Sequence, residues 1–182
     1  MLILASKSPR RKELLSTIVP SFLVIPAEID ERLLDPFLSP KDLAMEESKL
    51  KAYKIFASHP DDEILSCDTT VVLDNKALGK PKDEEDAWRM LSLEQGRKQI
   101  VLSAYTYISK DKQITRTVST EVYFNPLSEE QIHEYVSLFK PFDKAGSYGI
   151  QDDYPLIKKI VGSFNNVKGL PTEDLIAHVF KR

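Results

Sequence analysis

The chain has one cysteine, three histidines and no long hydrophobic run. Cys67 is the single thiol, so no disulfide bond can form within the chain, and this cysteine usage is typical of a reducing cytoplasm. The histidines lack the spacing of a zinc site, and the sequence has neither a Walker A motif nor the nucleophile elbow of a serine hydrolase. The first apolar run ends at Ala5 and Lys7 follows it. We therefore expect neither a signal peptide nor a membrane span.

An excess of positive charge is also missing. The formal net charge is -3 and the isoelectric point is near 5.7, which argues against nucleic acid or an anionic membrane as a partner. Any anion must therefore bind at a local site. The length of 182 residues and the hydrophobic content of 42% suit one globular domain. We expect a single domain over residues 1–182 in the cytoplasm.

Apolar, β-branched segments interleave with segments of helical character. We expect strands over 2–5, 22–27, 63–74, 99–109, 115–124 and 154–161, and helices that begin near 9, 40, 83, 129 and 171. Serine-proline pairs at 8–9 and 39–40 are typical helix starts, and Ser128 with Gln131 forms a capping box. Because the strands include a hairpin around Asp111, the sheet should be mixed and the class α/β or α+β.

The opening segment "LILASKSPRRKELL" places a short strand before the N-terminus of a helix. Free backbone N–H groups and the positive end of the helix dipole meet at such a point and favour an anion. Ser6 and Ser8 add hydroxyl groups, and Arg10 and Arg11 add guanidinium groups that suit phosphate oxygens. The segment predicts a triphosphate site. A simple helix cap with solvated arginines and a basic patch for nucleic acid are the alternatives.

Asp68 lies in "ILSCDTTVV", with apolar residues on both sides. A carboxylate in such a strand is unfavourable unless it is paired or bound to a metal. We interpret Asp68 as a cation ligand or as a base that deprotonates water. The alternatives are a buried carboxylate paired with a structural arginine and a carboxylate that lies outside the strand. Cys67 should face the other side of the strand as a small core residue.

Two lysines are candidates for contact with phosphate. In "LGKP", Pro81 keeps Lys80 out of the helical region, so that its ammonium group is presented from a defined turn. Lys51 in "KLKAYK" is the second candidate, although the pattern does not choose among Lys49, Lys51 and Lys54. A surface lysine in a turn is the alternative for Lys80.

Two loops could complete a site. Two glycines surround Tyr148 in "FDKAGSYGIQDD", which suggests close approach of the backbone to a ligand, and the amide of Gln151 could read the edge of a base. An ordinary irregular loop fits the composition as well. The acidic loop that contains Glu31 could supply a second carboxylate for a metal, and a solvated acidic run is its alternative.

In this order, "LASKSPRRKELL", "CDTTVVLD…LGKP", "DKAGSYGIQ" and "GSFNNVKGLP" resemble the Maf family of nucleoside triphosphate pyrophosphatases over nearly the whole chain. The resemblance implies an elongated fold similar to the inosine triphosphate pyrophosphatases, with a long sheet, two lobes and a central cleft. It also implies hydrolysis of a nucleoside triphosphate to monophosphate and pyrophosphate with Mg²⁺ or Mn²⁺. A homodimer is a further implication.

The resemblance also implies roles for individual residues. Phosphate binding falls on Ser6, Arg10 and Arg11; catalysis on Asp68, Lys51 and Lys80; metal binding on Asp68 and Glu31; and substrate binding also on Glu31 and Gln151. The tyrosine and glutamine of "AGSYGIQ" resemble the branch that acts on dTTP and UTP, although a modified pyrimidine nucleotide would need the same chemistry.

The chain departs from the family pattern at three places. "SCDT" stands for the usual "GADT", "DNK" for "DGE", and Gln99 for the usual histidine after "GR". None of these changes falls on a matched catalytic position. Because Gln99 replaces the usual histidine, the role of that histidine in this chain stays open. The alternative function is a non-catalytic regulator of septum formation and cell division that binds nucleotide or nucleic acid.

Overall fold

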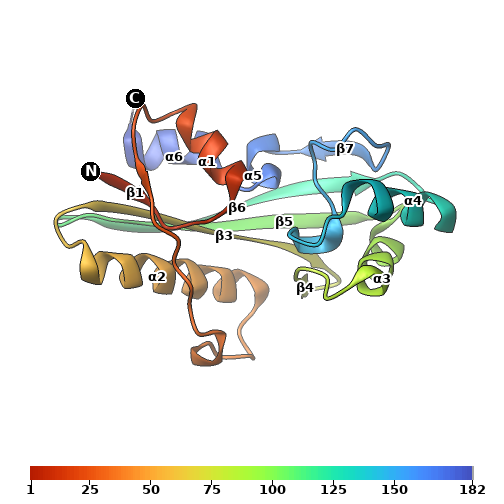
Figure 1. Cartoon of the computed structure of the whole chain (residues 1–182), viewed down its shortest axis with the longest axis horizontal. Helices are drawn as coiled ribbons and strands as arrows, with labels where there is room; N and C mark the ends of the chain where they lie inside the picture. The colour runs from red at the N-terminus through yellow and green to blue at the C-terminus, as the bar shows by residue number, and fades with distance from the viewer. Residues whose placement is uncertain (182) are drawn as a thin grey trace.

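One mixed sheet runs through the molecule, and the structure, a computed structural model, describes residues 1–181 (Figure 1). Its strands are β1 Leu2–Leu4, β2 Leu23–Val24, β3 Glu63–Leu73, β4 Lys76–Leu78, β5 Lys98–Ile108, β6 Gln113–Phe124 and β7 Ile157–Val161. The order across the sheet is β2, β1, β3, β5, β6, β7, and β4 pairs with β3. β1 is parallel to β2 and β3, whereas the other pairings are antiparallel. The predicted mixed sheet and fold class are therefore confirmed.

Helices cover both faces of this sheet. They are α1 Pro9–Ser16, α2 Pro40–Ser58, α3 Glu84–Glu94, α4 Glu129–Phe139, α5 Phe164–Lys168 and α6 Thr172–Leu175. Short helical turns span Glu31–Leu33, Ala145–Ser147 and Ile176–Phe180. In Figure 1, α2 lies along one face of the sheet, α1, α5 and α6 lie on the other, and α3 and α4 lie together toward one end. This end carries its own core.

Side-chain caps confirm the predicted starts of α1, α2 and α4. Ser8 accepts from the N–H of Arg11, and Ser39 accepts from the N–H of Asp42, with proline in the first turn each time. Ser128 forms the expected capping box at the start of α4. Each cap satisfies a backbone donor that the helix leaves free, which is worth about 1 kcal/mol. The short polar signals in the sequence therefore fix where α1, α2 and α4 begin.

Three of the predicted elements differ from expectation. The strand predicted over 22–27 shrinks to Leu23–Val24, because it lies at the edge beside β1 alone and Pro26 has no N–H to donate. The strand predicted from residue 154 begins at Ile157, after a turn in which the N–H of Leu156 bonds the carbonyl of Tyr154. The predicted terminal helix is divided into α6 and the π-helical turn Ile176–Phe180.

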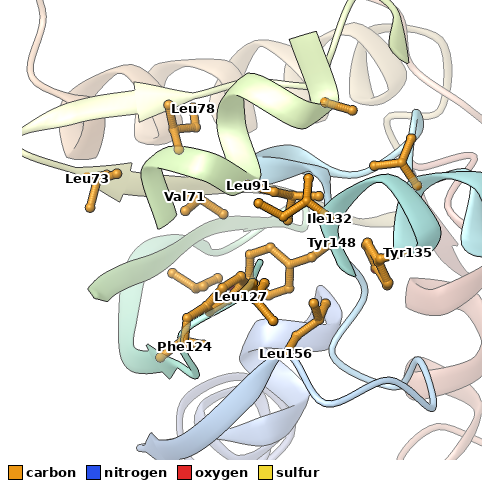
Figure 2. Close-up of a cluster of buried hydrophobic side chains, with 14 residues drawn as sticks. Val71, Leu73, Leu78, Leu91, Phe124, Leu127, Ile132, Tyr135, Tyr148 and Leu156 are labelled. Carbon is orange, nitrogen blue, oxygen red and sulfur yellow. The ribbon is translucent and has the colours of Figure 1, made fainter. Parts of the chain in front are cut away.

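The core has separate clusters toward the two ends of the sheet. One cluster packs α3 and α4 on β3, β5 and β6, and Figure 2 shows Val71, Leu91, Phe124, Tyr135 and Tyr148 within it. Another lies under α1 and α6 and includes Leu4, Leu15, Cys67, Tyr105 and Leu175. The prediction that Cys67 is a core residue is confirmed. Within residues 1–181 there is no helix long and apolar enough to span a membrane.

Candidate active site

A cavity of about 960 Å³ lies between segments that are far apart in the chain. Its walls come from the segment before α1, the acidic loop, α2, β3, the turn after β4 and the loop that precedes β7. All eight site residues predicted from the sequence line it: Ser6, Arg10, Arg11, Glu31, Lys51, Asp68, Lys80 and Gln151. Residues far apart in the chain therefore meet at one place, which a set of unrelated surface features would not do.

The opening segment forms one wall. The Oγ of Ser6 accepts from the backbone N–H of Ser8 at 3.2 Å, which shapes the turn into α1. Arg11 donates from Nε to the carbonyl of Gly169 at 2.8 Å and from Nη2 to Oγ1 of Thr69 at 3.0 Å. A guanidinium held by two fixed acceptors has a defined orientation in the cleft.

Arg10 is held differently. Its Nη1 donates to Oδ2 of Asp143 at 3.1 Å, and this pair joins α1 to the loop on the other side of the cleft. The side chain of Asp143 is 59% exposed, so water screens the pair and a phosphate can compete for the arginine.

Asp68 and Lys51 form an ion pair inside the cleft. Nζ of Lys51 lies 3.0 Å from Oδ1 of Asp68, and only 20% and 18% of the two side chains are exposed. Asp68 comes from the middle of β3 and Lys51 from α2, which packs across that strand. Asp68 is therefore paired, but with a lysine of the site rather than the structural arginine considered from the sequence.

Glu47 lies beside this pair and was missed by the sequence analysis. Burial, a hydrogen bond with Asp68 and the charge of Asp68 raise the pKa of Glu47 to about 8. Glu47 is one helical turn before Lys51 on α2, so both side chains face β3. That spacing was a usable signal once Lys51 had been chosen among the lysines.

Lys80 joins a group of cations. Burial first, and then the charges of neighbouring cations, lower the pKa of the Lys80 ammonium group. The neighbouring cations are Lys7, Arg11 and Lys51. These positive charges repel one another when no anion is bound. Such a group suits a polyanion such as a triphosphate.

The carboxyl groups of the cleft fit a hard divalent cation. Asp68 and Glu47 share a hydrogen bond, and the charge of Glu31 also acts on Glu47. Among residues 1–181 no group of three or more histidine, cysteine, aspartate or glutamate side chains is arranged to hold a metal ion. Mg²⁺ is commonly held by one or two carboxylates, with water and substrate phosphates as its other ligands. The donors present suit that kind of shared coordination.

Gln151 lies at the end of the loop that closes the cleft on the side of α4. The N–H of Gly146 donates to the carbonyl of Gly79 at 3.2 Å, and the N–H of Gly149 donates to the hydroxyl of Tyr135 at 2.9 Å. These bonds fix the loop, while the side chain of Gln151 stays exposed at the cavity. An exposed amide there can meet a base.

Thr69 and Asp143 also line the cavity and were not singled out from the sequence. Thr69 bonds Arg11 and, at 2.8 Å, the hydroxyl of Ser103 on β5. Asp143 meets Arg10 across 133 positions of the chain. Both contacts join residues that are far apart in the chain, so no local sequence pattern predicts them.

Comparison with known proteins finds a matching family model and similar proteins. A family model described as "Maf-like protein" matches residues 1–181. The chain is 45% identical to a protein of Chlorobaculum tepidum named "dTTP/UTP pyrophosphatase", over 97% of this chain and 92% of the relative. It is 46% identical to a protein of the same name from Thermosipho africanus, over 93% of this chain and 87% of the relative. Among solved structures it is similar to a Mycobacterium abscessus "Nucleoside-triphosphatase / dITP/XTP pyrophosphatase", with 12% identity, a TM-score of 0.46, and coverage of 99% and 94% of the two chains.

Proposed function

The chain belongs to the Maf family, and from that premise we propose that it hydrolyses nucleoside triphosphates, with dTTP and UTP as preferred substrates, to the monophosphate and pyrophosphate. The observation that carries the proposal is the convergence of the eight predicted residues on one cavity, with Asp68 and Lys51 paired inside it. The names of the relatives support the choice of reaction and of base.

Asp68 is the proposed base. Water attacks the α-phosphorus, a new P–O bond forms, and the bond from the α-phosphorus to the bridging oxygen breaks, so that pyrophosphate leaves. Asp68 orients the water and accepts its proton. The ammonium group of Lys51, 3.0 Å from Oδ1 of Asp68, holds this carboxyl group in a defined position in the cleft.

The cationic wall would bind the phosphates. Arg10, Arg11 and Lys80 are placed to neutralise the triphosphate and the charge that grows on the leaving pyrophosphate, and Ser6 adds a hydroxyl group at the same wall. Because Arg11 is already held by Gly169 and Thr69, little reorientation is needed when substrate arrives.

Asp68 and Glu31 are the residues proposed to hold Mg²⁺ or Mn²⁺, with Glu47 beside Asp68 as a further carboxyl group. When bound, the cation supplies positive charge that neutralises phosphate oxygens. The protein residues keep their own tasks: Asp68 handles the proton, and the basic side chains hold the phosphates.

Gln151 is proposed to read the base. An amide offers one acceptor and two donors, which match the alternating carbonyl and N–H groups of thymine or uracil. Its position on the loop beside the cavity leaves it free for that contact. We further propose that residues 1–182 act as one domain, as a homodimer, in the cytoplasm.

Product analysis tests the function. Purified protein with Mg²⁺ or Mn²⁺ should convert dTTP and UTP to monophosphate and pyrophosphate, resolved by chromatography, faster than the purine nucleotides. Release of diphosphate and orthophosphate would place the attack at the γ-phosphorus and contradict the proposal. Binding without turnover of any nucleotide would favour the regulator considered from the sequence.

A further inference from the structure

Glu94, the last residue of α3, is fully buried, and neither of its carboxyl oxygens has a hydrogen-bond partner within residues 1–181. Moving an unpaired carboxylate out of water costs far more than moving the neutral acid. Burial accordingly raises the pKa of Glu94 well above its usual value. Burial therefore favours the uncharged acid, which can donate one hydrogen bond and accept others.

The loop 145–151 presses directly on this carboxyl group. A side-chain carbon at Gly146 would lie 2.5 Å from Oε1 of Glu94 and 2.9 Å from Cγ2 of Val71, so the backbone passes where only glycine fits. Gly146 also has a φ of +72°, a conformation that favours glycine. Because its N–H bonds the carbonyl of Gly79, the loop is held between Glu94 and the turn after β4.

The hydroxyl of Tyr148, on the same loop, is a second buried polar group without a partner within residues 1–181. Burial first, and then the charge of Glu94, raise the pKa of Tyr148. Figure 2 shows Tyr148 within the core cluster, and its ring packs edge to face on Phe124 with centroids 4.8 Å apart. Glu94 and Tyr148 are thus neighbours beneath the wall of the cleft.

Few other titratable groups face Glu94. From α4, Tyr135 is close enough for Glu94 to add to the effect of burial on its pKa, and its hydroxyl donates to Asp152 at 2.6 Å. Arg97 follows α3, but its guanidinium pairs with Asp74 at 2.6 Å. Neither supplies a positive charge that would stabilise an ionised Glu94.

One side of the loop 145–151 faces the cavity that is proposed to bind the nucleotide. Tyr148, Gly149, Ile150 and Gln151 all line the cavity. We propose that Glu94 is a positioning residue: its carboxyl group, packed against Gly146 and near Tyr148, holds the loop 145–151 where Gln151 meets the nucleotide. The inference deepens the proposed function and rests on it.

Ionisation would disturb this arrangement. A carboxylate has no proton to donate, and in an apolar pocket it draws water toward itself. The loop backbone, which lies against the same oxygen, would have to move to admit that water. Nucleotide binding should therefore weaken when Glu94 ionises, while the chemistry at Asp68 continues at its own rate.

The test compares wild type with Glu94→Ala and Glu94→Gln, and uses Glu85→Gln, an exposed position on α3, as the matched control. Steady-state kinetics with dTTP at about pH 6 and about pH 9 give KM and kcat separately. Glu94→Ala should raise KM several-fold at both values, because the side chain that packs against Gly146 is lost, and Glu94→Gln, which keeps the volume and a neutral polar group, should restore the low KM. Between the two pH values KM should rise more in wild type than in Glu94→Gln, and Glu85→Gln should follow wild type.

Identical KM values in wild type, Glu94→Ala and Glu94→Gln would overturn the proposal. An equal fall of kcat in the two variants with unchanged KM would also overturn it. Hydrogen exchange of the amides in 145–151 provides a readout that does not need turnover. Exchange, corrected for intrinsic rates, should quicken toward about pH 9 in wild type and not in Glu94→Gln. Equal protection in both would contradict the inference, whereas an inactive wild type with that difference in exchange would contradict only the proposed function.

Discussion

Nζ of Lys51 lies 3.0 Å from Oδ1 of Asp68, and this pair joins the longest helix, α2, to the central strand β3 inside the cleft. The pair is accompanied by Glu47, whose pKa is raised to about 8 by burial and by its contact with Asp68. The cleft thus holds two carboxyl groups and one ammonium group in contact. Such a set is weak evidence for a stabilising role, because well-packed apolar residues of similar volume often stabilise a fold as much or more.

Replacement of Lys51 tests the pair. Lys51→Gln removes a cation that lines the cavity and pairs with Asp68, so kcat for dTTP should fall roughly a hundredfold, as measured by release of pyrophosphate. Lys49→Gln is the control, because Lys49 pairs with Glu46 at 2.9 Å and does not line the cavity. Equal losses in the two variants would remove Lys51 from the mechanism.

Arg11→Lys tests the geometry of the phosphate wall. A lysine keeps the charge but cannot bond both Gly169 and Thr69 as the guanidinium does. We expect KM for dTTP to rise about tenfold and the melting temperature to fall. Lys12→Gln, an exposed change in the next position of α1, should leave both quantities near wild type; a wild-type KM in Arg11→Lys would contradict the assignment.

Removal of the metal should stop turnover. The carboxyl groups suit a hard cation that shares its coordination with phosphate, so we expect a chelator to abolish activity and added Mg²⁺ or Mn²⁺ to restore it. Paramagnetic resonance of Mn²⁺ titrated into wild type and Asp68→Asn gives an independent readout. Full activity in the presence of excess chelator would show that the reaction needs no divalent cation.

Glu94 predicts how stability depends on pH. Its folded pKa is raised by burial, so below the unfolded pKa of about 4.3 the acid is protonated in both states and costs nothing. As pH rises the unfolded state ionises first, and the free energy of unfolding falls by about 1.4 kcal/mol per pH unit until the folded pKa is reached. Glu94→Gln lacks this term. Urea denaturation should show its advantage over wild type growing as the pH rises above about 5; a constant difference would mean that the pKa of Glu94 is not raised in the folded protein.

Local patterns in the sequence account for much of the fold. Ser8, Ser39 and Ser128 mark helix starts through bonds to backbone groups three residues away, and the hairpin of β5 and β6 follows from two β-branched segments around Asp111. The edge strand at Leu23–Val24 was overestimated because the extent of a strand depends on its partner, which the sequence does not show locally.

The candidate site could likewise be predicted only in part from local sequence. Ser6, Arg10, Arg11, Asp68 and Lys80 stand in segments whose residue types are unusual for their local structure, and ordered motifs tied them to one family. Thr69 and Glu94 could not be identified from the sequence in this way. Their importance depends on contacts with Arg11 and Gly146, respectively, which are distant in the chain. A buried glutamate at the end of an amphipathic helix has the same sequence signature as an exposed one.

The most direct measurement is kcat for dTTP with Mg²⁺ in wild type, Asp68→Asn and the exposed control Asp61→Asn, with circular dichroism to establish that all three are folded. If Asp68 is the base, Asp68→Asn loses roughly a thousandfold or more of the release of pyrophosphate, while Asp61→Asn keeps the wild-type rate. Wild-type turnover in folded Asp68→Asn would contradict the account of this cleft as the catalytic centre.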